Sequence, residues 1–267
     1  MRLWTIGVST LGSLVRNRLL IVFGILFVCT VLLFMTPLLT VRVTTTASNM
    51  PQAQAYVLEL VSVIMYMVSG CGSLLAAWAA ADAVATEMKS GTILAVMARP
   101  IKRWEFLAGK YLGVLMLMGF YVLMMLGLSY VLAWMGGQRI QTTPWVLVVY
   151  PMLRYAIYAA MAMALVTILH PVVSWGITVL LAVLAVLVLP TKQETNAILR
   201  GLKYGLYVIL PSTQLLSEER FLTIKDASLK PVGWLEHVVT LSYGIDYALV
   251  LLLVAMWSFH YRSLRRD

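Results

Sequence analysis

The stretch that decides the fold is 86–110, TEMKSGTILAVMARPIKRWEFLAGK, a polar and positively charged segment between two long apolar runs. Gly91 and Pro100 break the chain near its two ends. Between them, three apolar residues share one helical face: Ile93, Leu94 and Met97. The pattern predicts a short helix parallel to the membrane, with its polar face toward the cytosol. Periodicity alone leaves two interpretations open: a connector that rests on lipid, or a lever that a partner moves.

The composition predicts a membrane protein. The 267 residues are 61% hydrophobic and only 12% charged, whereas soluble domains are about half apolar and about a quarter charged. We therefore expect an all-α polytopic fold, with one transmembrane domain over residues 1–267. The net charge of +9 does not indicate nucleic acid, because Lys and Arg collect at the ends of apolar runs. No histidine or cysteine pair has the spacing of metal ligands, so we expect no metal on this chain.

Six apolar runs are expected to span the bilayer, each about as long as one hydrocarbon thickness or longer. They are 19–39, 57–85, 107–135, 145–169, 172–189 and 238–259. Before them, residues 1–18 predict an amphipathic helix in the interface. Its apolar face is expected to carry Leu3, Ile6, Leu11, Leu14 and Val15.

The connections between the spans differ in character. Residues 40–56 have the composition of a loop, and His170-Pro171 predicts a very tight turn between the fourth and fifth spans. The third span is longer than a bilayer needs, so its first turns are expected in the interface, where Lys110 can snorkel. Within the segment 190–237, the stretch 196–210 is too short and too charged to span, which predicts an interfacial or re-entrant helix.

The distribution of basic residues predicts the orientation. Lys and Arg accumulate at the N-terminus, in 86–110 and in the C-terminal tail, whereas the loops after the first and third runs hold only Arg42 and Arg139. The positive-inside rule therefore places both termini in the cytosol, with six spans in the cytoplasmic membrane. The segment 190–237 carries six basic residues, and only the parity of the spans places it outside.

Two ionisable residues fall well inside predicted spans, which makes them functional candidates. Arg154 lies about nine residues into the fourth span and Asp246 about eight residues into the sixth. Because both spans run inward, the two residues are expected at similar depth, facing each other across the bundle. They could form a structural ion pair or a substrate site.

A longer pattern in the opening stretch resembles a known family. The matching residues are Glu87, Gly91-Thr92, Leu94, Ala98-Arg99-Pro100, Arg103, Phe106 and Gly109-Lys110. The pattern is similar to that of the type-2 ABC exporter permeases, membrane subunits without a fused ATPase, which include the gliding-motility and nitrous-oxide-reductase-maturation permeases. LVRNRLLIV at 14–22 is similar to the family's elbow helix entering the first span, and LYVILPSTQLLS at 206–217 resembles its outer segment before the sixth.

The resemblance implies a permease subunit that pairs with a second copy or a paralogue. It also implies that the 86–106 loop is a coupling helix seated in a groove of a cytosolic ABC ATPase. The residues that would couple to that ATPase are Glu87, Gly91, Thr92, Leu94, Pro100 and Arg103. His170 and Pro171 fall where the family makes its second cytosolic contact. The chain has no GxxxxGK[ST] phosphate loop, so ATP and Mg²⁺ are expected on the partner.

Two other classes of function fit the sequence less well. An ATP-independent secondary transporter or channel could use Arg154 and Asp246, but it would predict internal repeats, and none is detected. A membrane enzyme would need clustered His, Asp or Glu side chains or a nucleophile with a base, and the chain has no such cluster. The segment 190–237 could also dock an extracytoplasmic partner.

Overall fold

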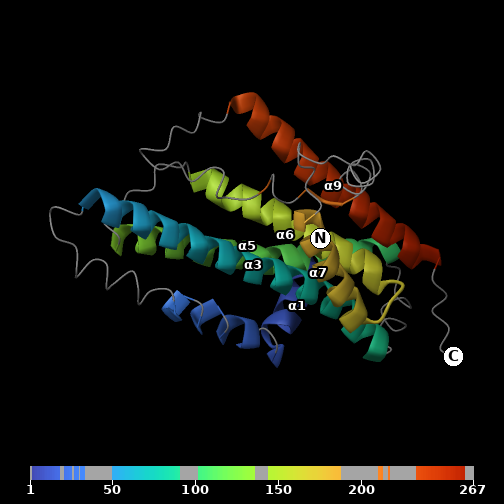
Figure 1. Ribbon diagram of the computed structural model, residues 1–267. Coiled ribbons are helices and arrows are strands. Elements are labelled where there is room, and N and C mark those ends of the chain that lie inside the picture. Colours follow the sequence, from blue (N-terminus) through green and yellow to red (C-terminus); the bar gives the residue numbers. More distant parts are fainter. Residues whose placement is uncertain are drawn as a thin grey trace.

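The computed structural model describes residues 2–18, 21–25, 27–29, 31–33, 50–90, 102–135, 144–187, 210–212, 216 and 233–261. Its main elements are six α-helices (Figure 1). They are α1 (Arg2–Val15), α3 (Met50–Ser90), α5 (Arg103–Met135), α6 (Pro144–Val166), α7 (Pro171–Leu187) and α9 (Trp234–Tyr261). No described residue lies in a strand, which confirms the prediction of an all-α membrane protein.

Four helices are long and apolar enough to cross a membrane. They are Val63–Met88, Arg103–Leu128, Trp145–Val166 and Trp234–Phe259, which correspond to the second, third, fourth and sixth expected spans. The first and fifth expected spans correspond to shorter apolar helices, Ile21–Leu33 and Pro171–Ala185.

The helices extend beyond several expected spans. Residues 50–56 were expected in a loop, but α3 begins at Met50. Pro51 fits the first turn, where its missing N–H is not needed, and the Gln and Ala residues after it are good helix formers. At the other end α3 continues to Ser90, beyond the expected end of the second span at residue 85. The last four residues of the expected coupling loop, 103–106, belong to α5.

α6 is the most enclosed of the four long helices. It packs against α3, α5, α7 and α9. Most side chains on α3 between residues 75 and 85 are buried alanines, as are Ala159, Ala160 and Ala162 of α6. Such small side chains let helix backbones approach closely in a membrane.

A polar cluster joins α3, α5 and α6 within this apolar packing. The Tyr121 hydroxyl donates to the Val68 carbonyl at 2.6 Å, and the Tyr155 hydroxyl lies 3.4 Å from the Ser69 carbonyl. A Cβ on Gly72 would lie 2.5 Å from the Tyr155 hydroxyl oxygen. Position 72 therefore needs glycine so that both tyrosines reach the backbone of α3.

α1 is held against α5 by close backbone contact. A Cβ on Gly109 would lie 2.7 Å from Ile6 Cβ, and one on Gly113 would lie 2.7 Å from the Gly7 carbonyl oxygen. Gly7 and Thr10 are buried in this crossing. Of the expected apolar face, Ile6 also lies in this crossing and Leu14 is buried, whereas Val15 is 52% exposed.

Part of the segment before α9 reaches deep along that helix. Leu210, Pro211 and Ser212 are buried, and the Ser212 N–H donates to the Tyr243 hydroxyl at 2.7 Å. Tyr243 lies nine residues into α9, about 14 Å from its start. Non-helical backbone is tolerated at such depth only where protein or water covers it, and Leu216 is fully buried beside α6 and α9. The rest of the expected re-entrant helix lies outside the described residues.

Exposed aromatic side chains lie near both ends of the long helices. Trp234 starts α9 and is 74% exposed, while Trp257 near its other end is 67% exposed. These two residues are 23 positions apart, about 35 Å along a helix. Exposed Trp104 and Trp134 lie near the two ends of α5, 30 positions or about 45 Å apart. Tryptophan is enriched at membrane–water interfaces, so the spacing on α9 fits one bilayer.

The glycine crossing gives a first prediction. Gly113→Ala should lower the stability of the chain by about 1–3 kcal/mol, because the new methyl has no room beside α1. Gly119→Ala on the same helix is the matched control, since nothing lies within 4 Å of a Cβ there. Thermal unfolding of the purified chain in detergent measures both. Equal melting temperatures for the two variants would contradict this account of the crossing.

Candidate functional site

One end of the bundle gathers the ends of several helices, and we call it the 87–110 end. The Phe106 ring at the start of α5 stacks on Phe259 near the end of α9, with centroids 6.0 Å apart. Next to Phe259, the Ser258 hydroxyl lies 2.9 Å from that of Thr167, which follows α6. The last turns of α3 reach this end through Glu87, which pairs with α5.

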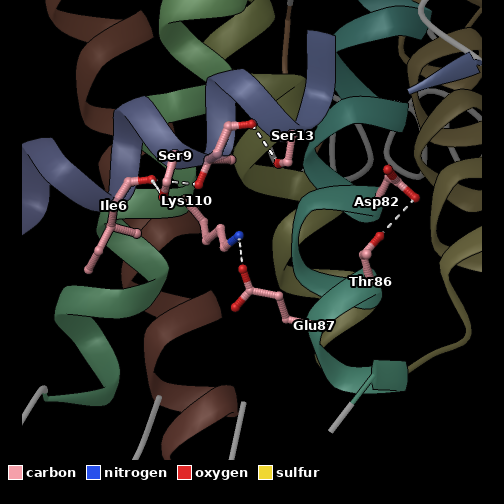
Figure 2. Close-up of polar contacts among 8 residues, drawn as sticks. Ile6, Ser9, Ser13, Asp82, Thr86, Glu87 and Lys110 are labelled. Carbon is pink, nitrogen blue, oxygen red and sulfur yellow. Dashed lines mark hydrogen bonds and ion pairs between the residues drawn. The ribbon is translucent and has the colours of Figure 1, made fainter. Parts of the chain in front are cut away.

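The ion pair between Glu87 and Lys110 is the central feature of this end. Glu87 lies one turn before the end of α3, and Lys110 lies two turns after the start of α5. The side chains are 26% and 5% exposed, respectively. Figure 2 shows them pointing toward each other below α1. Lys110 also lies 5.7 Å from the centroid of the Phe106 ring.

The position of Lys110 corrects the expectation that it snorkels to the interface. Its residue is only 4% exposed, because α1 packs over the neighbouring Gly109. A buried ammonium is costly unless it is paired and hydrogen-bonded, and Glu87 supplies that pairing. The two residues that begin and end the sequence pattern, 23 positions apart, therefore meet in space.

A second polar contact ties α1 to α3 near the same end. The Asn17 side-chain amide donates to one oxygen of Asp82 at 2.6 Å. The Thr86 hydroxyl donates to the other oxygen at 3.3 Å, as Figure 2 shows. Asp82 therefore joins the segment after α1 to the last turns of α3, close to Glu87.

α5 begins with a capped turn. The Lys102 N–H donates to the Glu105 carboxylate at 3.2 Å, the reciprocal contact typical of a helix N-terminus. Arg103 is the first residue of α5 and is partly exposed. The other coupling candidates, Gly91, Thr92, Leu94 and Pro100, lie outside the described residues, so their role stays a prediction.

The second expected contact, His170-Pro171, forms the tight turn that the sequence predicts. Thr167–His170 connects α6 to α7, and the Ser174 N–H donates to the His170 carbonyl at 2.9 Å. His170 is exposed, and so is the apolar Ile168 beside it, at 68%. Because Thr167 contacts α9 near Phe259, this turn belongs to the 87–110 end.

The comparison with protein families identifies the chain. Residues 5–264 match the family described as ABC-2 family transporter protein. The chain belongs to this family. The match covers nearly the whole sequence, so the ABC-2 chain is an integral membrane protein and a permease subunit of an ABC transporter. A comparison with curated proteins returned no match.

Among the described residues, no ion pair joins Arg154 to Asp246, the two intramembrane charges of the ABC-2 chain. Arg154 on α6 is partly buried, with its guanidinium carbon 5.6 Å from the centroid of the Tyr155 ring. Asp246 is exposed on α9. The ion pair found among the described residues is that of Glu87 and Lys110. An Arg154–Asp246 contact within one chain stays a prediction that this geometry does not support.

Sequence reasoning missed the partner of Glu87. The signal was present, because residues of opposite charge bracket the loop, and Gly109 precedes Lys110 in the pattern. From sequence alone, a lysine near the end of a span is interpreted as one that extends its ammonium group to the interface. That interpretation changes only when the helix that covers the lysine is known. No sequence pattern predicts the contact between Asn17 and Asp82. Among the described residues, no group of three His, Cys, Asp or Glu side chains could hold a metal.

The ion pair gives a second prediction. Lys110→Met should destabilise the ABC-2 chain by about 3 kcal/mol, the lower end of the range for breaking a buried pair, because Glu87 keeps some solvent contact. Glu87→Gln should cost at least as much, because Lys110 is the more buried partner. The double variant should cost less than the two single losses added together. Thermal unfolding in detergent provides the measurement, and strictly additive losses would show that the two charges do not interact.

Proposed function

We propose that this permease is the membrane subunit of an exporter. A separate cytosolic ABC ATPase binds residues 86–106 and supplies the energy by hydrolysing ATP. ATP and Mg²⁺ bind to that ATPase, and this chain supplies no cofactor. The proposal depends on one structural observation, the ion pair between Glu87 and Lys110. The family match supports the same proposal independently.

The pair explains how a short loop could move long helices. Glu87 and Lys110 flank the coupling segment, one on each helix that the segment connects. Their contact fixes the ends of α3 and α5 to each other, so a push on the segment reaches both helices together. Without the pair, the same push would first move the end of α3 away from the start of α5 and would displace the rest of the two helices less.

The location of the second contact supports the same assignment. A partner that docks on 86–106 needs a further surface at the same end of the bundle. The exposed turn around His170 and Pro171 lies at the 87–110 end and presents Ile168 beside them. Arg103, which starts α5 and is partly exposed, is the coupling candidate next to the segment.

The proposal fixes an orientation for the chain. The 87–110 end faces the cytosol, α1 is the elbow helix, and both termini are cytosolic in the inner membrane. The shorter helices Ile21–Leu33 and Pro171–Ala185 complete six spans. The subunit works as a pair with a second permease chain, and 190–237 faces outward, where it could meet an extracytoplasmic partner. The family match favours this function over an ATP-independent carrier that uses Arg154 and Asp246.

The experiment compares the same substitution at both ends of the bundle. The tagged permease is purified from membranes of its own cells, which supply the proposed ABC ATPase, and ATP hydrolysis is measured in the purified sample. Thr92→Asp and Leu94→Asp should each reduce the co-purified ATPase activity at least about tenfold, since a carboxylate placed in an apolar contact must be desolvated. Thr142→Asp, in the sequence between α5 and α6, is the matched control and should retain it.

Full ATPase activity with both segment variants would contradict the proposal, because it would show that the segment is not the docking site. The amount of folded permease in each sample is measured by size-exclusion chromatography, so that a loss of activity is compared at equal amounts of folded chain.

A further inference from the structure

The exposed surface of α1 has two chemically different faces. Trp4, Val8 and Val15 are exposed and share one face of the helix, with spacings of four and seven residues. A second exposed face is polar and comprises Thr5, Ser9, Ser13 and Arg16. At about 100° per residue, both faces are turned away from Gly7 and Thr10, which contact α5. Beyond its contact with the bundle, α1 therefore presents an amphipathic surface.

The level of α1 along α5 is that of the boundary between lipid headgroups and acyl chains. α1 crosses α5 at Gly109 and Gly113, five and nine residues after the exposed Trp104, or about 8 and 14 Å along the helix. Tryptophan is enriched at the membrane–water interface, and an amphipathic helix inserts its apolar face about 5–10 Å beyond it. The apolar face of α1 is thus level with acyl chains, and its polar face is level with headgroups.

Two arginines at the end of this surface have no partner within the chain. Arg16 and Arg18 are exposed, and neither forms an ion pair or a hydrogen bond with another described residue. The nearby carboxylate of Asp82 accepts instead from Asn17, which lies between the two arginines, and from Thr86. Residues 1–58 contain no Asp or Glu. The positive charge at the end of α1 is therefore available to an anion from outside the chain.

We propose that Arg16 and Arg18 form a binding site for the headgroups of anionic phospholipids. Each guanidinium group presents several N–H donors in a plane, which match two oxygens of a phosphodiester. Phosphatidylcholine offers the same phosphate but also carries a cation, so the site favours a lipid with net negative charge, such as phosphatidylglycerol. The adjacent apolar face favours lipid over a soluble acidic protein, because exposed tryptophan and valine side chains fit acyl chains. The inference goes beyond the proposed function and does not depend on the ATPase.

Short-range quenching by labelled lipids tests the site in the full chain. In a chain with Cys29→Ala and Cys71→Ala, Ser13→Cys carries a fluorescent label on the polar face, three residues before Arg16. The chain is reconstituted into vesicles of phosphatidylcholine and phosphatidylglycerol, in which a trace of either lipid carries a nitroxide high on one acyl chain. The ratio of phosphatidylglycerol to phosphatidylcholine near the label, derived from the two quenching efficiencies, should exceed the bulk ratio at least about fivefold, the effect of one basic residue near anionic lipid.

Charge-matched variants separate this site from the net charge of the chain. Arg16→Gln combined with Arg18→Gln should return the lipid ratio near the label to about the bulk value, a loss of at least about fivefold. Arg265→Gln combined with Arg266→Gln removes the same charge from the C-terminal sequence and should leave the enrichment unchanged. Size-exclusion chromatography before reconstitution selects folded chain in every sample.

Three results would overturn the proposal. The bulk lipid ratio around the native arginines would assign their charges to water or to a protein partner. Full enrichment after Arg16→Gln and Arg18→Gln would show that other groups attract the lipid. An equal loss with the two C-terminal substitutions would show that only the net charge of the chain matters.

Discussion

A buried lysine that must be neutralised dominates the architecture of the 87–110 end. Lys110 is almost fully enclosed because the glycines of α5 let α1 lie directly on its backbone. Once the ammonium is taken out of water, a carboxylate must be close, and Glu87 at the end of α3 provides it. The closeness of the α1 crossing therefore determines which side chains meet, and the pair in turn fixes where α3 and α5 end relative to each other.

The same end illustrates how a membrane bundle stays ordered without a hydrophobic drive between its helices. Small residues allow close contact, and a few polar bonds specify the register. Asn17 with Asp82 holds the chain after α1 to α3, and Thr167 with Ser258 holds α6 to α9. Toward the opposite end, Tyr150 and His237 lie 2.7 Å apart between the same two helices. Polar contacts thus fix α6 and α9 at two levels, and a displacement at one end can be passed along both helices.

Much of the fold follows from the sequence, because lipid imposes simple rules. Long apolar runs must be helices, and Pro171 marks a helix boundary that the structure shows. The sequence did not predict that α3 would already be helical at Met50, because a polar run beside a span has the composition typical of a loop. It also did not predict the partner of Lys110 or the outward position of Asp246. Both depend on which helix packs on which face, and a rotation of one helix by half a turn leaves hydropathy unchanged.

The central claim is that opposite charges at 87 and 110 must attract for the coupling segment to transmit motion. The most direct test exchanges them, with Glu87→Lys and Lys110→Glu made singly and together, while the ATP hydrolysis that co-purifies with the tagged permease is measured. Each single change places like charges side by side and should abolish the activity, whereas the exchange should restore a substantial part of it. Full activity in either folded single variant, or a folded double variant as inactive as the single ones, would contradict the account.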